Sequence, residues 1–296
     1  MSEQSSRRTD IDAEKAVDLL SAVTGDHYRL VGPLAGGQTG ATEIRRGDEN
    51  RYVLKWELDP SNQRGRREGA RLAERLRSEA HWPSPRQQLV EVEDCLLVVQ
   101  EFMIGSNVDH ITHDLVDSVI DLHEARLGLV EVDGPSAWAK DMLKLLIEGG
   151  NGYCLHQPLR TFDFRTRRVV ERIEEIGRSA HVGDLDGNDI VHSDLHPGNL
   201  LQVDGRLTAV VDMDYTRLGD AAFDLAMLAV ASLEVGADPG VRHRLFELGL
   251  HALSDTKRRV YVANLLLRNL DWSIRKNRTA ETDFWLAESD RLLAVD

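Results

Sequence analysis

The sequence predicts an α+β protein with two lobes, an N-terminal lobe of strands with one long helix and a larger, mainly helical C-terminal lobe. At 296 residues the chain is long for a single hydrophobic core. Apolar runs typical of strands concentrate before residue 104, whereas apolar stripes with helical spacing dominate after residue 115. We place the boundary near Gly105, which gives an N-terminal lobe at residues 1–104 and a C-terminal lobe at residues 105–296.

A polar tail at residues 1–10 opens the N-terminal lobe, and we expect it to be disordered. The apolar pattern then predicts helices at 11–23 and 64–80 and strands at 28–34, 41–46, 51–56, 89–92 and 95–102. The turn at 35–40 carries Gly36 and Gly37 between two of these strands. It lacks the Gly-Lys-Ser/Thr ending of a Walker A loop.

Lys55 lies in the otherwise apolar run at 51–56, where a charged side chain needs a partner of opposite charge. The helix expected at 64–80 offers Glu68 as the first candidate for this partner and Glu74 as the second. The alternative is that Lys55 extends its ammonium group to solvent from the end of a strand.

Helical stripes in the C-terminal lobe predict helices at 115–129, 137–147, 169–176, 221–233, 241–253 and 257–274. His123 falls in the apolar stripe of the first of them, and we expect a core histidine. Asp220 directly precedes the nearly all-apolar helix at 221–233, so it is a natural N-cap. Asp224 falls one turn inside that helix among apolar residues, where a carboxylate needs hydrogen-bond donors.

The dipeptide Asp204-Gly205 lies between two apolar runs, 200–203 and 207–211. This is a strong signal for a β-hairpin, because a type I′ turn requires a positive φ at both central positions.

A two-residue turn would place Asn199 opposite Val210 and Asp212 opposite Pro197. Because side chains alternate along a strand, Asn199 and Asp212 would share one face as diagonal neighbours, about 7–8 Å apart at the backbone. One divalent cation fits between two such oxygen ligands.

Asp194 lies five residues before Asn199, in the loop that leads into this hairpin. An Asp, an Asn five residues later and a further Asp match the arrangement used for phosphoryl transfer. In that arrangement the first Asp accepts the proton of the acceptor hydroxyl, and the other two side chains bind Mg²⁺.

Three blocks in this region together resemble the aminoglycoside phosphotransferase family, which also includes choline and homoserine kinases. They are HSDLHPGNLL at 192–201, VDMD at 211–214 and GDAAFDLA at 219–226. Two positions depart from the usual pattern, since Ser193 stands where Gly is usual and Ala221 where Pro is usual. Neither change removes a chemical group that the reaction needs.

The resemblance implies a bilobal protein-kinase-like fold and a Mg²⁺-dependent transfer of phosphate from ATP, or GTP, to a hydroxyl group of a small molecule. Asp194 would be the catalytic base, and Asn199 and Asp212 would bind the metal. The nucleotide would be bound by Lys55, oriented by Glu68, by the glycine turn with Gly36 and Gly37, and by the backbone around Gln100, Glu101 and Met103. Asp224 would hold backbone N–H groups of the catalytic loop, with His192 and Asp220 as further structural support.

The acceptor implied by the resemblance is a cationic antibiotic, either an aminoglycoside or a cyclic peptide antibiotic that is also cationic. Phosphorylation of this antibiotic would give resistance. A choline, homoserine or sugar kinase is the alternative. The family builds its acceptor pocket from C-terminal helices, so Asp271, Trp272, Asp283 and Trp285 are candidates, and the sequence favours none of them.

Two interpretations from other classes remain open. A nucleotide-binding regulator without turnover would be expected to lack one of Lys55, Asp194, Asn199 and Asp212, and all four are present. A zinc hydrolase could use His192 and His196, but Pro197 disfavours a helix through both histidines and no cysteine lies nearby.

The net charge of −14 argues against nucleic acid or an anionic membrane as a partner and suits a cationic substrate. No apolar run is long enough to span a membrane, and the N-terminus lacks the apolar region of a signal peptide, so we expect a cytoplasmic protein. Cys95 and Cys154 are expected to be reduced thiols. A monomer and a homodimer are both compatible with the sequence.

Overall fold

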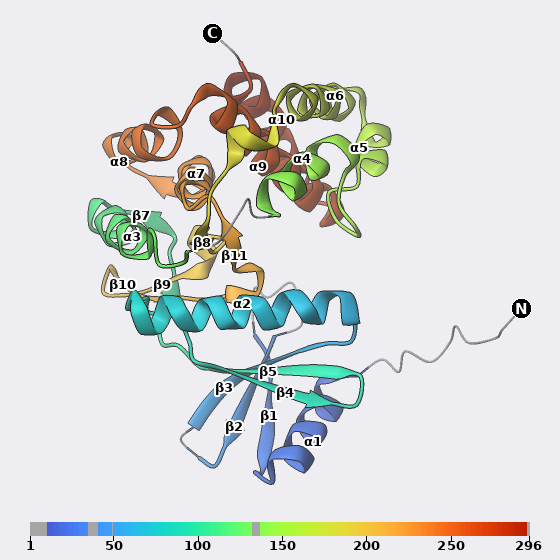
Figure 1. The fold of residues 1–296 in the computed structure, drawn as a ribbon, viewed down its shortest axis with the longest axis vertical. Coiled ribbons are helices and arrows are strands. Elements are labelled where there is room, and N and C mark those ends of the chain that lie inside the picture. Colours follow the sequence, from blue (N-terminus) through green and yellow to red (C-terminus); the bar gives the residue numbers. More distant parts are fainter. Residues whose placement is uncertain (1–10, 35–40, 49, 132–136, 295–296) are drawn as a thin grey trace, which may run out of the picture. The chain divides into compact units, whose positions relative to one another are not determined.

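The computed structural model describes residues 11–34, 41–48, 50–131 and 137–294, and Figure 1 shows its helices and strands. The chain forms two compact units, the first made of residues 1–108 and 198–216 and the second of residues 109–197 and 217–296. This division differs from the boundary expected at Gly105 because the central hairpin belongs to the first unit. The glycine turn with Gly36 and Gly37 and the tail at 1–10 lie outside the described residues.

An antiparallel sheet in the order β1-β2-β3-β5-β4 forms the frame of the first unit. Its strands are β1 (Tyr28–Pro33), β2 (Thr42–Arg46), β3 (Asn50–Glu57), β4 (Gln87–Val92) and β5 (Cys95–Glu101). All of them were predicted within a few residues of these bounds.

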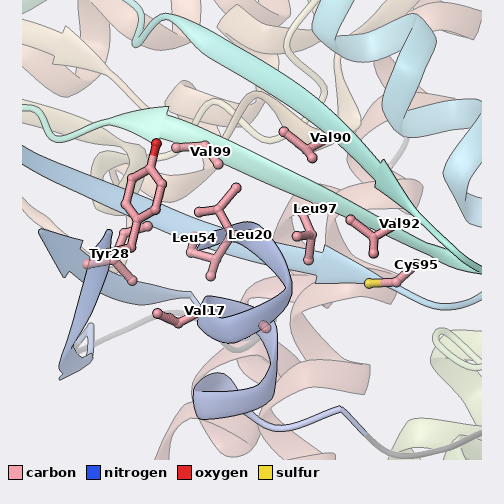
Figure 2. Close-up of a cluster of buried hydrophobic side chains, with 11 residues drawn as sticks. Val17, Leu20, Tyr28, Leu54, Val90, Val92, Cys95, Leu97 and Val99 are labelled. Atoms are coloured by element: carbon pink, nitrogen blue, oxygen red, sulfur yellow. The ribbon is translucent and has the colours of Figure 1, made fainter. Parts of the chain in front are cut away.

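Helix α1 (Ala13–Thr24) covers one face of this sheet. Its buried residues Val17 and Leu20 pack on Leu54 of β3 and on Leu97 and Val99 of β5, which Figure 2 shows as one apolar cluster. Leu97 and Val99 lie on this face because side chains alternate along a strand. Val98, between them, therefore faces the other side of the sheet.

Helix α2 (Pro60–Glu79) lies on the other side of the sheet from α1 (Figure 1). It begins four residues before the predicted start, because the Asp59 side chain caps the Ser61 N–H and Pro60 fits the first turn of a helix. Gly69 of α2 allows a close approach to another backbone, since a Cβ there would lie 3.1 Å from the Thr216 carbonyl oxygen. The helix is thereby held against the turn that follows the central hairpin.

The central hairpin consists of β9 (Leu200–Val203) and β10 (Arg206–Val210), and β9 also pairs with the short strand β6 (Ser106–Asn107). Asp204 and Gly205 form the predicted turn with φ of 51° and 76°, so the predicted turn is confirmed.

The predicted register of this hairpin holds next to the turn, where Arg206 pairs with Val203, and is wrong by one residue beyond Leu207. A bulge at Thr208, whose hydroxyl donates to the Leu201 carbonyl at 3.2 Å, places Leu200 opposite Val210. Asn199 consequently lies in a 3-10 turn, where its carbonyl accepts the Val211 N–H at 2.9 Å. Asp212 follows the strand in a left-handed conformation, with φ 60° and ψ 53°.

The second unit is mainly helical, as expected. Its helices are α3 (His113–Arg126), α4 (Trp138–Glu148), α5 (His156–Phe162), α6 (Phe164–Ser179), α7 (Ala222–Ala231), α8 (Pro239–Phe246), α9 (Asp255–Arg275) and α10 (Thr279–Leu292). Short strands β8 (Asp189–Val191) and β11 (Arg217–Gly219) pair before and after the central hairpin, and β7 (His110–Ile111) pairs with β12 (Gly236–Ala237).

Helix α7 lies at the centre of the core of the second unit, and nearly all of its residues are buried. Its Phe223 makes edge-to-face contacts with Trp138 of α4, at a centroid distance of 5.1 Å, and with Tyr261 of α9, at 5.2 Å. Within the described ranges, no helix combines the length and apolarity needed to cross a membrane.

Candidate active site

Lys55 of β3 lies between two carboxylates of the segment that follows the hairpin. Its Nζ donates a 2.9 Å hydrogen bond to Asp212 Oδ1 and another of 2.9 Å to Asp214 Oδ2. The Lys55 and Asp214 side chains are 6% and 4% exposed, whereas that of Asp212 is 30% exposed. The Asp214 carboxylate is thus enclosed by protein, and the Asp212 carboxylate is open to a ligand.

The prediction that Glu68 pairs with Lys55 is wrong. Glu68 lies on the exposed face of α2 and forms an ion pair with Arg71, at 2.7 Å, one turn along the same helix. Glu74, the second candidate, pairs in the same way with Arg77. Both carboxylates stabilise the surface of the helix.

The residue that α2 does contribute to this cluster is an arginine. Arg66 donates a 2.6 Å hydrogen bond to Asp214 and lies 3.5 Å from Glu57 at the end of β3. Asp214 therefore bridges Lys55 of the sheet and Arg66 of the helix.

Electrostatics keep this cluster ionised. Burial disfavours the Lys55 ammonium, but attraction to Asp214 and Asp212 outweighs burial and raises the pKa of Lys55. Burial likewise opposes ionisation of Asp214, but attraction to Lys55 and Arg66 prevails and lowers the pKa of its carboxyl group.

Asn199 and Asp212, the predicted metal ligands, both belong to the first unit. Asn199 directly precedes β9, and Asp212 follows the end of β10. Their amide and carboxylate oxygens are the hard donors that Mg²⁺ accepts in proteins. The Asp212 side chain is partly exposed, so an ion can reach it from solvent, whereas Asn199 is buried.

The loop that carries Asp194, the predicted catalytic base, belongs to the second unit, where buried groups hold its backbone. Asp224 of α7 accepts the backbone N–H groups of His192 and Ser193 at 2.8 and 2.9 Å, so its predicted contact is confirmed. His192 is fully buried, and its Nδ1 accepts the Asp194 N–H at 3.2 Å. This hydrogen bond is the kind of contact that we expected of His192 as a structural residue.

Arg126 of α3 is a partner of Asp224 that the sequence did not reveal. It is fully buried, forms an ion pair with the Asp224 carboxylate and donates to the Ala221 carbonyl at 2.9 Å. The Arg126 Nη2 also lies 3.1 Å from Nδ1 of His123. His123 is thus a partly buried histidine with a polar partner in this network.

Ala221 takes the N-cap position that was predicted for Asp220, and Asp220, one residue earlier, accepts the N–H of Ala222, the first residue of α7, at 2.9 Å. Its other oxygen accepts from Lys257 at 2.5 Å and from the Tyr261 hydroxyl at 2.8 Å. These two residues of α9 fasten that helix to the start of α7.

Helix α9 also supplies Arg268, which donates to both Asp194 and the Ser193 carbonyl. No local pattern indicated this residue, because it is one of several arginines on an otherwise buried helix. The predicted catalytic carboxylate is therefore already paired with a guanidinium group.

The end of β5 and the residues that follow it were predicted to contact the adenine through backbone groups of Gln100, Glu101 and Met103. Gln100 lies inside the sheet ladder, and the Glu101 N–H donates to the Arg86 carbonyl at 2.9 Å. Met103 lies beyond the end of β5. The Gln100 Nε2 is buried and has no hydrogen-bond partner among the described residues. Gln100 therefore also carries a side-chain donor, whereas only its backbone was expected to contact the adenine.

The four candidates for acceptor binding have partners within their own unit. Asp271 pairs with Arg275 at 2.7 Å and Asp283 pairs with Arg165 at 2.8 Å. Trp285 is a core residue. The Trp272 ring is flanked by cations, of which the Lys276 Nζ is the nearest at 4.7 Å from the ring centroid. The part of the chain that the structure describes holds no cluster of three His, Cys, Asp or Glu side chains suited to a metal such as zinc.

The antiparallel sheet, the lysine cluster and the braced Asp loop define an α+β phosphotransferase of protein-kinase-like fold. The phosphotransferase enzyme family matches residues 31–261, and the chain belongs to this family. The chain is accordingly an enzyme of the phosphotransferase class. Comparison with curated proteins gives no significant match.

Solved structures share the fold at low sequence identity. A thermostable mutant of aminoglycoside phosphotransferase APH(4)-Ia, in a ternary complex with AMP-PNP and hygromycin B, aligns with a TM-score of 0.66, 16% identity, and coverage of 95% of this chain and 98% of that one. The gentamicin complex of APH(2")-IIa aligns with a TM-score of 0.59, 17% identity, and coverage of 97% and 98%. Choline kinase LicA from Streptococcus pneumoniae aligns with a TM-score of 0.56, 16% identity, and coverage of 93% and 98%.

Proposed function

We propose that this enzyme transfers the γ-phosphate of ATP to a hydroxyl group of a small molecule in a Mg²⁺-dependent reaction. The observation that carries the proposal is the buried Lys55 between Asp212 and Asp214, because a lysine beside a partly open carboxylate suits a metal-bound triphosphate. The binding of AMP-PNP by a protein of the same fold supports a nucleotide as the phosphate donor.

In this proposal Lys55 binds the nucleotide phosphates, and Asn199 with Asp212 holds the metal. When bound, Mg²⁺ offsets the charge that develops on the transferred phosphate. Asp194 orients the acceptor hydroxyl and receives its proton. Asp224 holds the backbone of His192 and Ser193, and His192 holds that of Asp194, so that the Asp194 carboxylate need not be ordered during the reaction.

For the acceptor we propose a cationic antibiotic that carries hydroxyl groups. The net charge of −14 favours the approach of a cation. Proteins of the same fold bind hygromycin B and gentamicin. A metabolite kinase is the second candidate, and the fold similarity to choline kinase LicA supports it.

An assay of ADP or GDP release, with ATP and GTP tested against a panel of acceptors, tests both candidates. The panel contains aminoglycosides, cyclic peptide antibiotics, choline, homoserine and sugars. Stimulation by an antibiotic, together with protection of growth by the expressed gene, supports the resistance function. Stimulation by choline or homoserine alone would replace it with the metabolite kinase function.

The catalytic assignment has its own test. Asp194→Asn should lower kcat by about 10²–10⁴-fold, which is the usual contribution of a positioned base, and leave nucleotide binding intact. A near-normal single-turnover rate for this variant would refute the role of Asp194. Nucleotide binding without turnover of any acceptor would instead support a regulatory protein.

A further inference from the structure

Two carboxylates contact Lys55, and they differ in what else holds them. Asp214 is almost fully enclosed and accepts a second hydrogen bond, of 2.6 Å, from Arg66. Asp212 is partly exposed, and Lys55 is its one ion-pair partner among the described residues. The two contacts to Lys55 have the same length, 2.9 Å, so their surroundings decide which contact can be given up.

We propose that Asp214 is the positioning residue that anchors Lys55, and that Arg66 fastens Asp214 to α2. Asp212 is then the exchangeable partner, available to a divalent cation. This inference rests on the proposed function and adds the means by which the phosphate-binding lysine is held.

The charge balance of the cluster supports this division of roles. Removing one partner from a buried ion pair is costly because it leaves the other charge uncompensated. When Asp212 turns to another cation, Lys55 keeps Asp214, so its ammonium is never buried alone. If Asp214 made the same exchange, Lys55 would keep only the partly exposed Asp212, and Arg66 would keep only its longer contact to Glu57, at 3.5 Å.

The packing of α2 supports the anchoring as well. Gly69 lets the helix lie directly against the carbonyls of the turn that carries Asp214, with a virtual Cβ 3.4 Å from the Asp214 carbonyl oxygen. Arg66 lies one turn earlier on the same helix. The helix therefore positions Lys55 through Arg66 and Asp214, and the surface residue Glu68 takes no part.

The test is a calorimetric titration of ADP into the full chain over a range of Mg²⁺ concentrations. Asp214→Asn should weaken ADP binding about 10- to 100-fold, the usual range for losing a hydrogen bond to a charged group. It should also raise the Mg²⁺ concentration needed for half-maximal binding, because Lys55 then pairs with Asp212 alone and competes with the ion. Glu68→Gln should bind ADP and Mg²⁺ like the wild type.

A matched pair of arginine variants on α2 tests the same inference if Asp214→Asn fails to fold. Arg66→Met should reproduce the weaker ADP binding and the higher Mg²⁺ requirement, whereas Arg71→Met, which removes only the surface pair with Glu68, should not. Asp214→Glu, which keeps a carboxylate, should recover part of the affinity.

The outcomes separate the inference from the proposed function. If Asp214→Asn and Arg66→Met melt at lower temperature but keep wild-type ADP affinity and Mg²⁺ requirement, their role is structural and the anchoring is overturned. The anchoring is also overturned if Glu68→Gln is the variant that loses affinity. If the wild type binds neither ADP nor GDP, the proposed function fails, and the anchoring role fails with it.

Discussion

Arg268 Nη2 donates a 2.6 Å hydrogen bond to Oδ1 of Asp194, and Nη1 of the same side chain donates one of 2.9 Å to the Ser193 carbonyl. Burial opposes the charge of Arg268, but attraction to Asp194 outweighs burial and raises the pKa of the guanidinium group. One side chain of α9 thus contacts both the backbone of Ser193 and the carboxylate of Asp194, the proposed catalytic base.

Arg268→Met should lower kcat by about 10- to 100-fold, since hydrogen bonds to charged groups contribute about 1.5–3 kcal/mol and Asp194 would lose its orientation. Arg268→Lys should fall between this variant and the wild type, because an ammonium cannot reproduce the two-pronged contact. Steady-state kinetics with the best acceptor gives both values.

Arg258→Met is the matched control for Arg268, because Arg258 lies on the same helix and pairs only across the surface with Asp255. Its kcat should equal that of the wild type. An unchanged or higher kcat in Arg268→Met would show that the guanidinium restrains Asp194 instead of positioning it.

The buried pair of Arg126 and Asp224 should be a major source of stability in the second unit. Both side chains are fully buried, and Asp224 also accepts two backbone N–H groups of the catalytic loop. Arg126→Met leaves the carboxylate without its cation, and we expect a loss of about 3–5 kcal/mol in the free energy of unfolding. Urea denaturation measures this loss.

A second ion pair of α3 provides the comparison. Asp117 of α3 pairs with Arg244 of α8 at 2.5 Å, and these side chains are 57% and 35% exposed, unlike the buried Arg126 and Asp224. Arg244→Met should therefore cost at most about 1 kcal/mol. Equal losses for Arg126→Met and Arg244→Met would contradict the assignment of Arg126 as the dominant brace.

The sequence predicted the features of the site that depend on local patterns. The turn at Asp204-Gly205 follows from the backbone conformation that a tight hairpin demands, and the contact of Asp220 with the start of α7 follows from its place before an apolar helix. Asp224 was found because a carboxylate inside such a helix needs donors, and the family resemblance named backbone N–H groups of the loop before Asp194 as these donors.

The features that were missed depend on contacts between distant parts of the chain. Lys55 meets Asp212 and Asp214 at separations of 157 and 159 residues, and nothing in the spacing along α2 shows that Glu68 faces solvent. The bulge at Thr208 was missed for a related reason. It depends on a hydroxyl that can reach the carbonyls of Leu201 and Ile104, and many threonines in strands do not bulge.

His123 should make the second unit less stable in mild acid. Burial and the nearby Arg126 lower the pKa of His123, and the smaller influence of Asp224, Asp189 and Asp220 opposes this without reversing it. The unfolded chain takes up a proton near pH 6.5, before the folded one does. Stability is therefore full above about pH 6.5 and declines as pH falls toward the pKa of the folded state.

His123→Gln keeps a hydrogen-bond acceptor near Arg126 but removes the titration. The free energy of unfolding of the wild type should fall relative to this variant between pH 7.5 and 5.5, with a slope of at most about 1.4 kcal/mol per pH unit. Parallel pH profiles for the two proteins would show that His123 does not titrate in this window.

Two glycines of α2, Gly65 and Gly69, should respond oppositely to the same substitution. A Cβ at Gly65 would meet no atom within 4 Å, whereas one at Gly69 would lie 3.1 Å from the Thr216 carbonyl oxygen. Gly65→Ala should stabilise the chain by about 0.5–1 kcal/mol, because glycine is unfavourable inside a helix.

Gly69→Ala gains the same helix propensity but must push α2 away from the turn that carries Asp214. Overpacking of this kind costs about 1–3 kcal/mol, so the net change should be destabilising. Because Arg66 and Asp214 connect α2 to Lys55, Gly69→Ala should also weaken ADP binding, whereas Gly65→Ala should not. Thermal denaturation and calorimetry on the two variants separate these effects, and a Gly69→Ala protein as stable and as tightly binding as Gly65→Ala would mean that the close approach of α2 does not matter to the site.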